Sequence, residues 1–154
     1  MILKPKLPWQ PAVQRALFGA GCVVIVWHTL IAAPWLFHVL GRAGAGPAAS
    51  ALIRPFYLTQ LGLLSLALLL ERLTVGNLSR LMLMLGGLMT IFFEWKIMQQ
   101  MTAIRLQTGL MDEASRHAWG LGHAASFGLT ALMLVIFAVL YCKTAACRAL
   151  PPEK

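Results

Sequence analysis

Four long apolar stretches, each close to the length that crosses a lipid bilayer, most constrain how this chain can fold. They cover residues 16–40, 55–70, 80–104 and 117–142, and polar or glycine-rich segments separate them. A helix needs about 20 mostly apolar residues to cross the hydrocarbon core. Charged residues make up only 12% of the chain, against about 25% in a soluble domain. The sequence therefore predicts an all-α fold, an integral membrane four-helix bundle.

The positions of the basic residues predict the orientation of this bundle. Eight of them lie on the side of the two termini: Lys4, Lys6, Arg15, Arg72, Arg80, Lys143, Arg148 and Lys154. Five lie on or toward the other side: Arg42, Arg54, Lys96, Arg105 and Arg116. Because Lys and Arg are retained on the cytoplasmic side, we expect both termini in the cytoplasm (N-in/C-in) and the protein in the cell inner (plasma) membrane. Scattered singly, these residues form no basic face, so no nucleic-acid partner is expected.

The expected domain organisation follows from the same boundaries. A single transmembrane domain covers residues 16–142, between a cytoplasmic N-terminal segment, 1–15, and a cytoplasmic tail, 143–154. Its principal partner is the lipid bilayer. A homo-oligomer or a larger membrane complex is a further expected form of association.

Prolines and charged residues mark the expected helix ends. Pro34 predicts a kink near the end of the first helix. A turn over 41–50, rich in glycine and alanine, then leads to Pro55, which suits the first turn of a second helix. Glu71 is expected to end that helix in water.

Few polar residues interrupt the apolar stretches, and the helix rise brings several of them to one level. At about 1.5 Å per residue, His28 and Glu94 lie roughly 20 Å above the cytoplasmic boundary. Gln60 and His123 lie roughly 9 Å beneath the opposite boundary. An ionisable group in hydrocarbon must find a partner or reach the interface. We therefore expect Glu94 to point inward, toward the other three, and Lys96 to extend outward, while the cytoplasmic half is almost purely apolar.

This polar layer carries the functional hypothesis. The candidate ligand-binding residues are His28, Gln60, Glu94, Lys96, His123 and Ser126. The candidate pocket rim is Arg54, Arg105 and Arg116. The layer would bind, or help move, an extracytoplasmic small molecule, ion or lipid, and the rim suits an anionic ligand or a lipid headgroup. An equally weighted alternative is that these side chains only hydrogen-bond across the bundle and fix the helix register.

Other functions have less support in the sequence. His28 and His123 could ligate a haem b between two helices, which would make the protein an electron-transfer module. No other cofactor and no metal site is predicted. A non-enzymatic protein is favoured, because no nucleophile with an oriented base is visible. A structural or assembly subunit of a membrane complex is the remaining alternative.

Two segments carry a family resemblance. One is Ala32-Ala33-Pro34-Trp35-Leu36-Phe37, followed by Leu40 and by Arg54-Pro55-Phe56-Tyr57; the other is Arg116 to Ser126, with His123 and Ser126 as a His-x-x-Ser motif. Together they resemble the transmembrane protein 205-like family, a group built on a domain of unknown function. The resemblance covers nearly the whole chain and implies a four-helix membrane protein. The family's proline-containing stretch in the third helix is replaced here by Glu94-Trp95-Lys96-Ile97-Met98, so no third-helix role is carried over.

Overall fold

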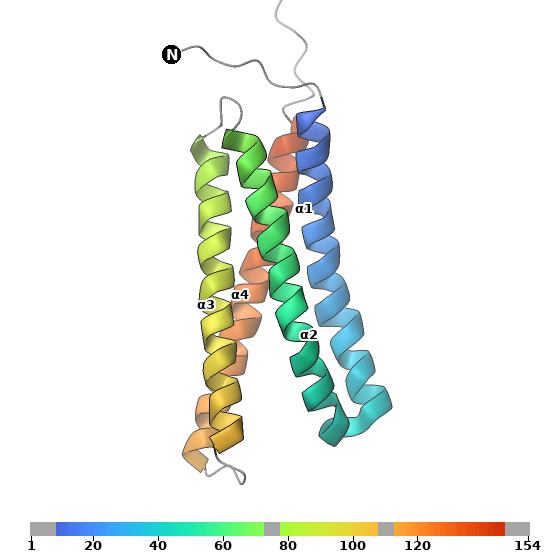
Figure 1. Ribbon diagram of the computed structural model, residues 1–154, viewed down its shortest axis with the longest axis vertical. Helices are drawn as coiled ribbons and strands as arrows, with labels where there is room; N and C mark the ends of the chain where they lie inside the picture. The colour runs from blue at the N-terminus through green and yellow to red at the C-terminus, as the bar shows by residue number, and fades with distance from the viewer. Residues whose placement is uncertain (1–8, 73–77, 108–112, 147–154) are drawn as a thin grey trace, which may run out of the picture.

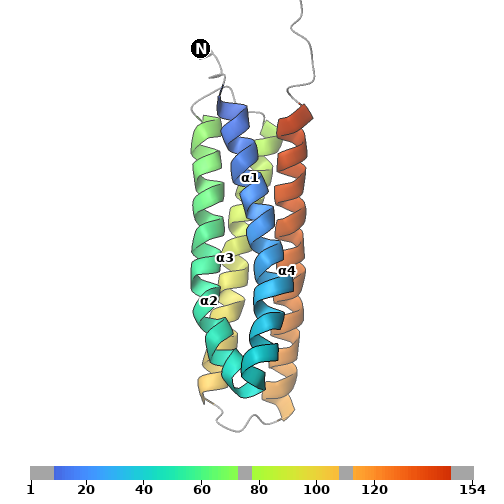
Figure 2. The same cartoon turned by 90° about the vertical axis from the view of Figure 1, so that its right-hand side faces the viewer.

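The computed structural model describes residues 9–72, 78–107 and 113–146, and nearly all of these residues are helical. Its elements are α1 (Gln10–Val26), the π-helical segment η1 (Trp27–Ala32), α2 (Ala33–Arg72), α3 (Leu78–Gln107) and α4 (Glu113–Ala146). The helices run side by side in an up-and-down bundle in which α1 packs on α2 and α4, and α3 packs on the same two (Figures 1 and 2). The start of α1 and the end of α4 lie at the same end of the bundle (Figure 1), which we call the terminal end.

Four segments of these helices are long and apolar enough to cross a membrane: Gln10–Gly41, Ala48–Glu71, Leu78–Ala103 and Glu113–Ala145. Their outer surfaces expose large apolar side chains such as Val23, Leu30 and Leu78, each more than 60% exposed. Apolar surface on this scale needs lipid around it. The predicted all-α, four-helix membrane architecture is confirmed, whereas the direction in which the bundle faces stays a prediction.

The first two helices begin earlier than the sequence predicted. α1 starts at Gln10 rather than near residue 16, with Pro11 in its first turn, where no backbone N–H is needed. The chain reverses at Gly41, whose φ of 62° and ψ of 179° are accessible essentially to glycine alone. The expected turn over 41–50 is wrong beyond that residue, because helix resumes at once. Pro55 therefore lies inside α2 and not in its first turn.

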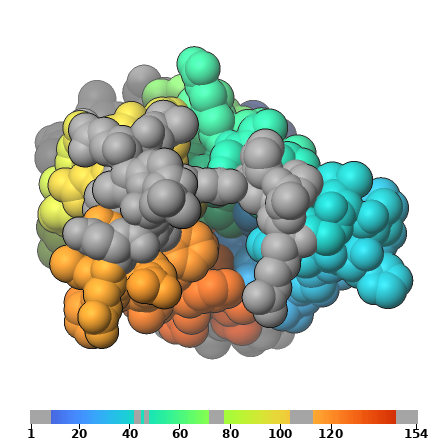
Figure 3. All heavy atoms as spheres, turned by 90° about the horizontal axis from the view of Figure 1, so that it is seen from below, coloured from blue at the N-terminus to red at the C-terminus, as the bar shows by residue number. Residues whose placement is uncertain are grey.

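The π-helical segment η1 stands where Pro34 was expected to kink the first helix. Proline has no N–H, so the carbonyl four residues earlier loses its helical partner. The backbone widens just before this point, and the Ala33 N–H bonds the His28 carbonyl, five residues back, in the π pattern. Beyond η1, the part of α2 around its reversal projects to one side of the other helices (Figure 3, cyan).

A closely packed core fills the half of the bundle at the terminal end. Its largest fully buried apolar side chains come from all four helices: Phe18, Ile25, Leu64, Met84, Ile91, Met133, Phe137 and Leu140. The rings of Phe18 and Phe137 pack with centroids 6.5 Å apart. This half contains no polar passage among the described residues, because apolar side chains occupy its centre.

Buried polar side chains close the terminal end above this core. Glu71 is 1% exposed and accepts hydrogen bonds from Gln14 Nε2 (2.7 Å) and from Arg80 Nη2 (2.8 Å). The expectation that Glu71 ends its helix in water is therefore wrong. The physical reason is that α1, α2 and α3 converge at this point, so a carboxylate needs a cationic partner inside the bundle.

Gly21 on α1 packs directly against the Phe137 ring of α4 and generates a stability prediction. A Cβ at Gly21 would clash with the Phe137 ring, whereas a Cβ at Gly120 would meet nothing within 4 Å. We expect Gly21→Ala to destabilise the bundle by about 1–2 kcal/mol, because overpacking outweighs the gain in helix propensity. Gly120→Ala is the matched control and should be neutral or slightly stabilising. Equilibrium unfolding in mixed micelles measures both, and equal effects would contradict the packing described.

Candidate functional site

A cavity of about 380 Å³ occupies the half of the bundle away from the terminal end. Its lining comes from η1, from the parts of α2 before and after Gly41, from the second half of α3 and from the first half of α4. Its polar lining residues are His28, Thr29, Ser50, Tyr57, Glu94, Thr102, His123, Ser126 and Thr130. Its aromatic lining residues are Phe37, Phe56, Trp119 and Phe127, together with Tyr57. Ligand pockets commonly combine such an apolar wall with a few convergent polar groups.

The Glu94 carboxyl is the most deeply buried ionisable group of the cavity wall, at 2% exposure. Its Oε1 accepts hydrogen bonds from Ser126 Oγ (3.1 Å) and from Thr130 Oγ1. The Tyr57 hydroxyl lies close to the same carboxyl. Because the two bonding hydroxyls come from α4, they fix the register of α3 against α4. The carboxyl thus finds hydrogen-bond donors where hydrocarbon would offer none.

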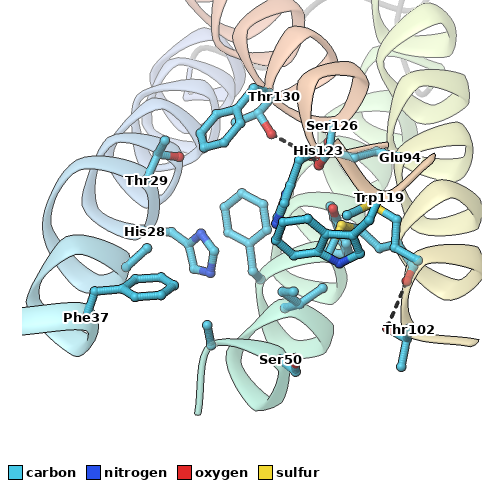
Figure 4. A pocket seen from close by; sticks show the side chains of 18 residues that line it. His28, Thr29, Phe37, Ser50, Glu94, Thr102, Trp119, His123, Ser126 and Thr130 are labelled. Atoms are coloured by element: carbon cyan, nitrogen blue, oxygen red, sulfur yellow. Dashed lines mark hydrogen bonds between the residues drawn. The ribbon is translucent and has the colours of Figure 1, made fainter. Parts of the chain in front are cut away.

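The two histidines reach the cavity from different helices. Figure 4 shows His28 projecting from the first helix and His123 from α4 into the same space. The His28 ring stacks on Phe56 with centroids 4.2 Å apart, and the His123 ring lies against the Trp119 ring at 4.0 Å in an edge-on arrangement. These aromatic contacts position both imidazoles in the cavity wall, and the ring nitrogens of an imidazole can donate or accept a hydrogen bond to a ligand.

Four of the six candidate residues meet at this cavity: His28, Glu94, His123 and Ser126. Gln60 does not line it. That side chain is 1% exposed within the helix interface, and its Oε1 has no hydrogen-bond partner among the described residues. Lys96 is also absent from the wall; it is exposed, with Nζ 5.7 Å from the Phe92 ring centroid. Two residues correspond to about 200° around a helix, so Lys96 points away from Glu94.

The candidate rim residues separate in the structure. Arg54 lines a second, adjoining cavity between α2 and α3. Arg116 is exposed near the start of α4 and lines neither cavity. The side chain of Arg105 lies outside the described part of the chain.

Sequence reasoning missed several lining residues. Thr130 follows His123 by seven residues and Ser126 by four, so all three share one face of α4. That spacing could have identified Thr130. Tyr57 and Trp119 lie near the ends of the predicted membrane segments, where aromatic residues are often at the interface, so only the fold brings them to the cavity.

The chemistry available to the cavity is binding through hydrogen bonds and apolar contact. Two imidazoles can each donate or accept, the hydroxyls can do both, and the aromatic wall suits an apolar body. In the described ranges, no three His, Cys, Asp or Glu side chains come together as a metal site. His28 and His123 are the residues that could ligate a haem iron.

A family model, domain of unknown function DUF4149, matches residues 16–109. The chain belongs to the DUF4149 family. The match covers more than half of the chain, including His28, Arg54, Tyr57 and Glu94. It ends before α4, so the wall formed by Trp119, His123, Ser126 and Thr130 lies beyond the DUF4149 region. Neither the curated proteins nor the solved structures give a match.

The bond between Thr130 and Glu94 generates a second prediction. A double-mutant cycle of Thr130→Val and Glu94→Met should give a coupling free energy of about 0.5–1.5 kcal/mol, the range of interhelical hydrogen bonds in membranes. Thr102→Val is the matched control, because the Thr102 hydroxyl bonds the Met98 carbonyl of its own helix. In equilibrium unfolding, the changes in unfolding free energy caused by Thr102→Val and Glu94→Met should add. If the changes caused by Thr130→Val and Glu94→Met also added, the hydrogen bond between Thr130 and Glu94 would be contradicted.

Proposed function

We propose that this multi-pass membrane protein binds a small amphipathic molecule from the extracytoplasmic half of the membrane and catalyses no reaction. The cavity carries the proposal, because it joins an apolar, aromatic wall to two imidazoles and a carboxyl at membrane depth. An amphipathic molecule satisfies both parts of such a wall. Residence in the cell inner membrane, cytoplasmic termini and the likeness to the transmembrane protein 205-like family belong to the same proposal.

Binding is favoured over passage across the membrane. The cavity lies in one half of the bundle, and the core around Phe18, Leu64 and Phe137 fills the other half. A polar solute would have to pass the large apolar side chains of that core and would pay the cost of desolvation. Release back into the same leaflet, or transfer to another molecule at that leaflet, needs no such path.

The histidines support haem b as a second candidate. His28 and His123 line one cavity from different helices, and cofactor sites in helical bundles are built from side chains on facing helices. A bound haem would supply one-electron chemistry, and the protein would hold its iron through these two imidazoles. The purified protein, expressed with haem supplied, would then show a Soret band that His28→Ala or His123→Ala removes. Its absence would end this alternative.

A cavity-filling substitution tests ligand binding. Ala49 lines the cavity, whereas Ala131 is exposed on the outside of α4. In vesicles that contain the wild-type protein, a long-chain fatty alcohol carrying a diazirine should cross-link mainly to cavity residues. Ala49→Phe should lower that labelling at least about fivefold, since the added ring occupies the space that the probe needs.

Ala131→Phe is the matched control and should leave the cavity labelling unchanged. Thermal unfolding of both variants separates lost binding from lost folding. Cross-links spread over the lipid-facing surface and insensitive to Ala49→Phe would contradict the proposed function.

A further inference from the structure

A second cavity of about 280 Å³ opens between α2 and α3 beside the first. The two cavities share five lining residues: Ser50, Ile53, Tyr57, Met98 and Thr102. A molecule too large for either space alone can therefore extend along this shared wall. The second cavity adds Arg54, Trp95 and Gln99 to the lining.

Arg54 gives the second cavity its charge. It is the only charged residue in the described lining of that cavity, and no salt bridge to it is present among the described residues. The other polar groups include the indole N–H of Trp95, which can only donate, and the Gln99 amide. A lining with a guanidinium and no carboxylate favours a ligand whose head is an anion rich in acceptor oxygens.

The depth of Arg54 favours a ligand that comes from the membrane. The second span begins at Ala48, so Arg54 lies roughly 9 Å along it at about 1.5 Å per residue. An arginine at this depth is stabilised by reaching the headgroup region or by an anionic partner. Lipids with anionic headgroups supply such a partner near the headgroup region, and each headgroup is attached to an apolar chain.

The contacts around Tyr57 define how the two cavities meet. The Tyr57 ring lies against Trp95 of α3, with centroids 6.1 Å apart, and against Phe56 at 5.3 Å. Tyr57 thus forms part of the wall of both spaces, with Ile53 and Met98 as apolar neighbours in that wall. An apolar chain that starts beside Arg54 can follow these side chains toward the aromatic lining of the first cavity.

We infer that the two cavities form one site for an anionic single-chain amphiphile, with its carboxylate or phosphate head on Arg54 and its apolar chain in the first cavity. This inference rests on the proposed function, because it assigns a ligand class to the same cavity. It adds the position of the head and the sign of its charge. Fatty-acid carboxylates and single-chain phospholipids share this chemistry.

The test uses two diazirine probes of equal chain length, a fatty acid and the corresponding fatty alcohol, in phosphatidylcholine vesicles. The wild-type protein should be labelled by the acid on the order of tenfold more strongly than by the alcohol, as a charge-assisted hydrogen bond allows. Arg54→Gln should reduce acid labelling to the alcohol level and leave alcohol labelling unchanged. A probe with a phosphate head then distinguishes phospholipids from fatty acids as the preferred source of the anion.

Two further variants control this test. Arg116→Gln removes an exposed arginine that lines neither cavity, so it should preserve the preference for the acid. Arg54→Lys keeps the positive charge and should retain part of the preference. Thermal unfolding shows that each variant is folded.

Equal labelling by acid and alcohol in the wild-type protein would overturn the inference and leave the proposed function standing. An unchanged acid preference in Arg54→Gln would also overturn it. Failure of both probes to label cavity residues would instead count against the proposed function itself, and Ala49→Phe would then have no effect on labelling by either probe.

Discussion

The hydrogen bonds between Glu94 and the hydroxyls of Ser126 and Thr130 are the interaction on which the rest of this structure depends. Hydrocarbon offers no donors to a carboxyl, so Glu94 must find them inside the bundle. Both donors lie on α4, and they set how α3 and α4 are rotated and aligned. The same face of α4 carries His123. The cost of burying one carboxyl therefore determines which side chains meet at the cavity.

The bundle combines a packed half with a hollow half. Near the terminal end, apolar side chains from four helices fill the interior, and Glu71 with Arg80 closes it above. Farther away, η1 and the reversal at Gly41 alter the path of the first two helices. The cavity lies in this second half. Interhelical bonding and ligand binding are compatible here, because Glu94 is held by α4 hydroxyls while the two imidazoles line the remaining wall.

The sequence predicted how deep each polar residue lies in the membrane better than it predicted which side of its helix that residue faces. Helix rise alone indicated that His28, Glu94 and His123 share one level, and they line one cavity. Rotation about each helix axis was harder to predict, because core and lipid are both apolar and periodicity then carries little information. Gln60 is an example: its side chain is buried at the expected depth but does not line the cavity.

Contacts between distant segments were beyond prediction altogether. The pairing of Glu71 with Arg80 and Gln14 depends on where three helices converge. Glycine and proline positions predicted the helix boundaries only in part. The chain does reverse at Gly41, but the helix resumes directly after it and continues through Pro55.

Accessibility of α3 to a lipid-soluble quencher tests the central claim most directly. Nitroxide labels placed singly at positions 91, 92 and 93, after replacement of the native cysteines, leave Glu94 in place and report collisions with oxygen dissolved in the bilayer. The structure predicts low accessibility at Ile91, which is 2% exposed and lies on the same face of α3 as Glu94, and high accessibility at Phe92 and Phe93, which are 55% and 58% exposed. Accessibility at position 91 as high as at position 93 would mean that the face of α3 that carries Glu94 is turned toward lipid, and would contradict both the register of α3 on α4 and the cavity built upon it.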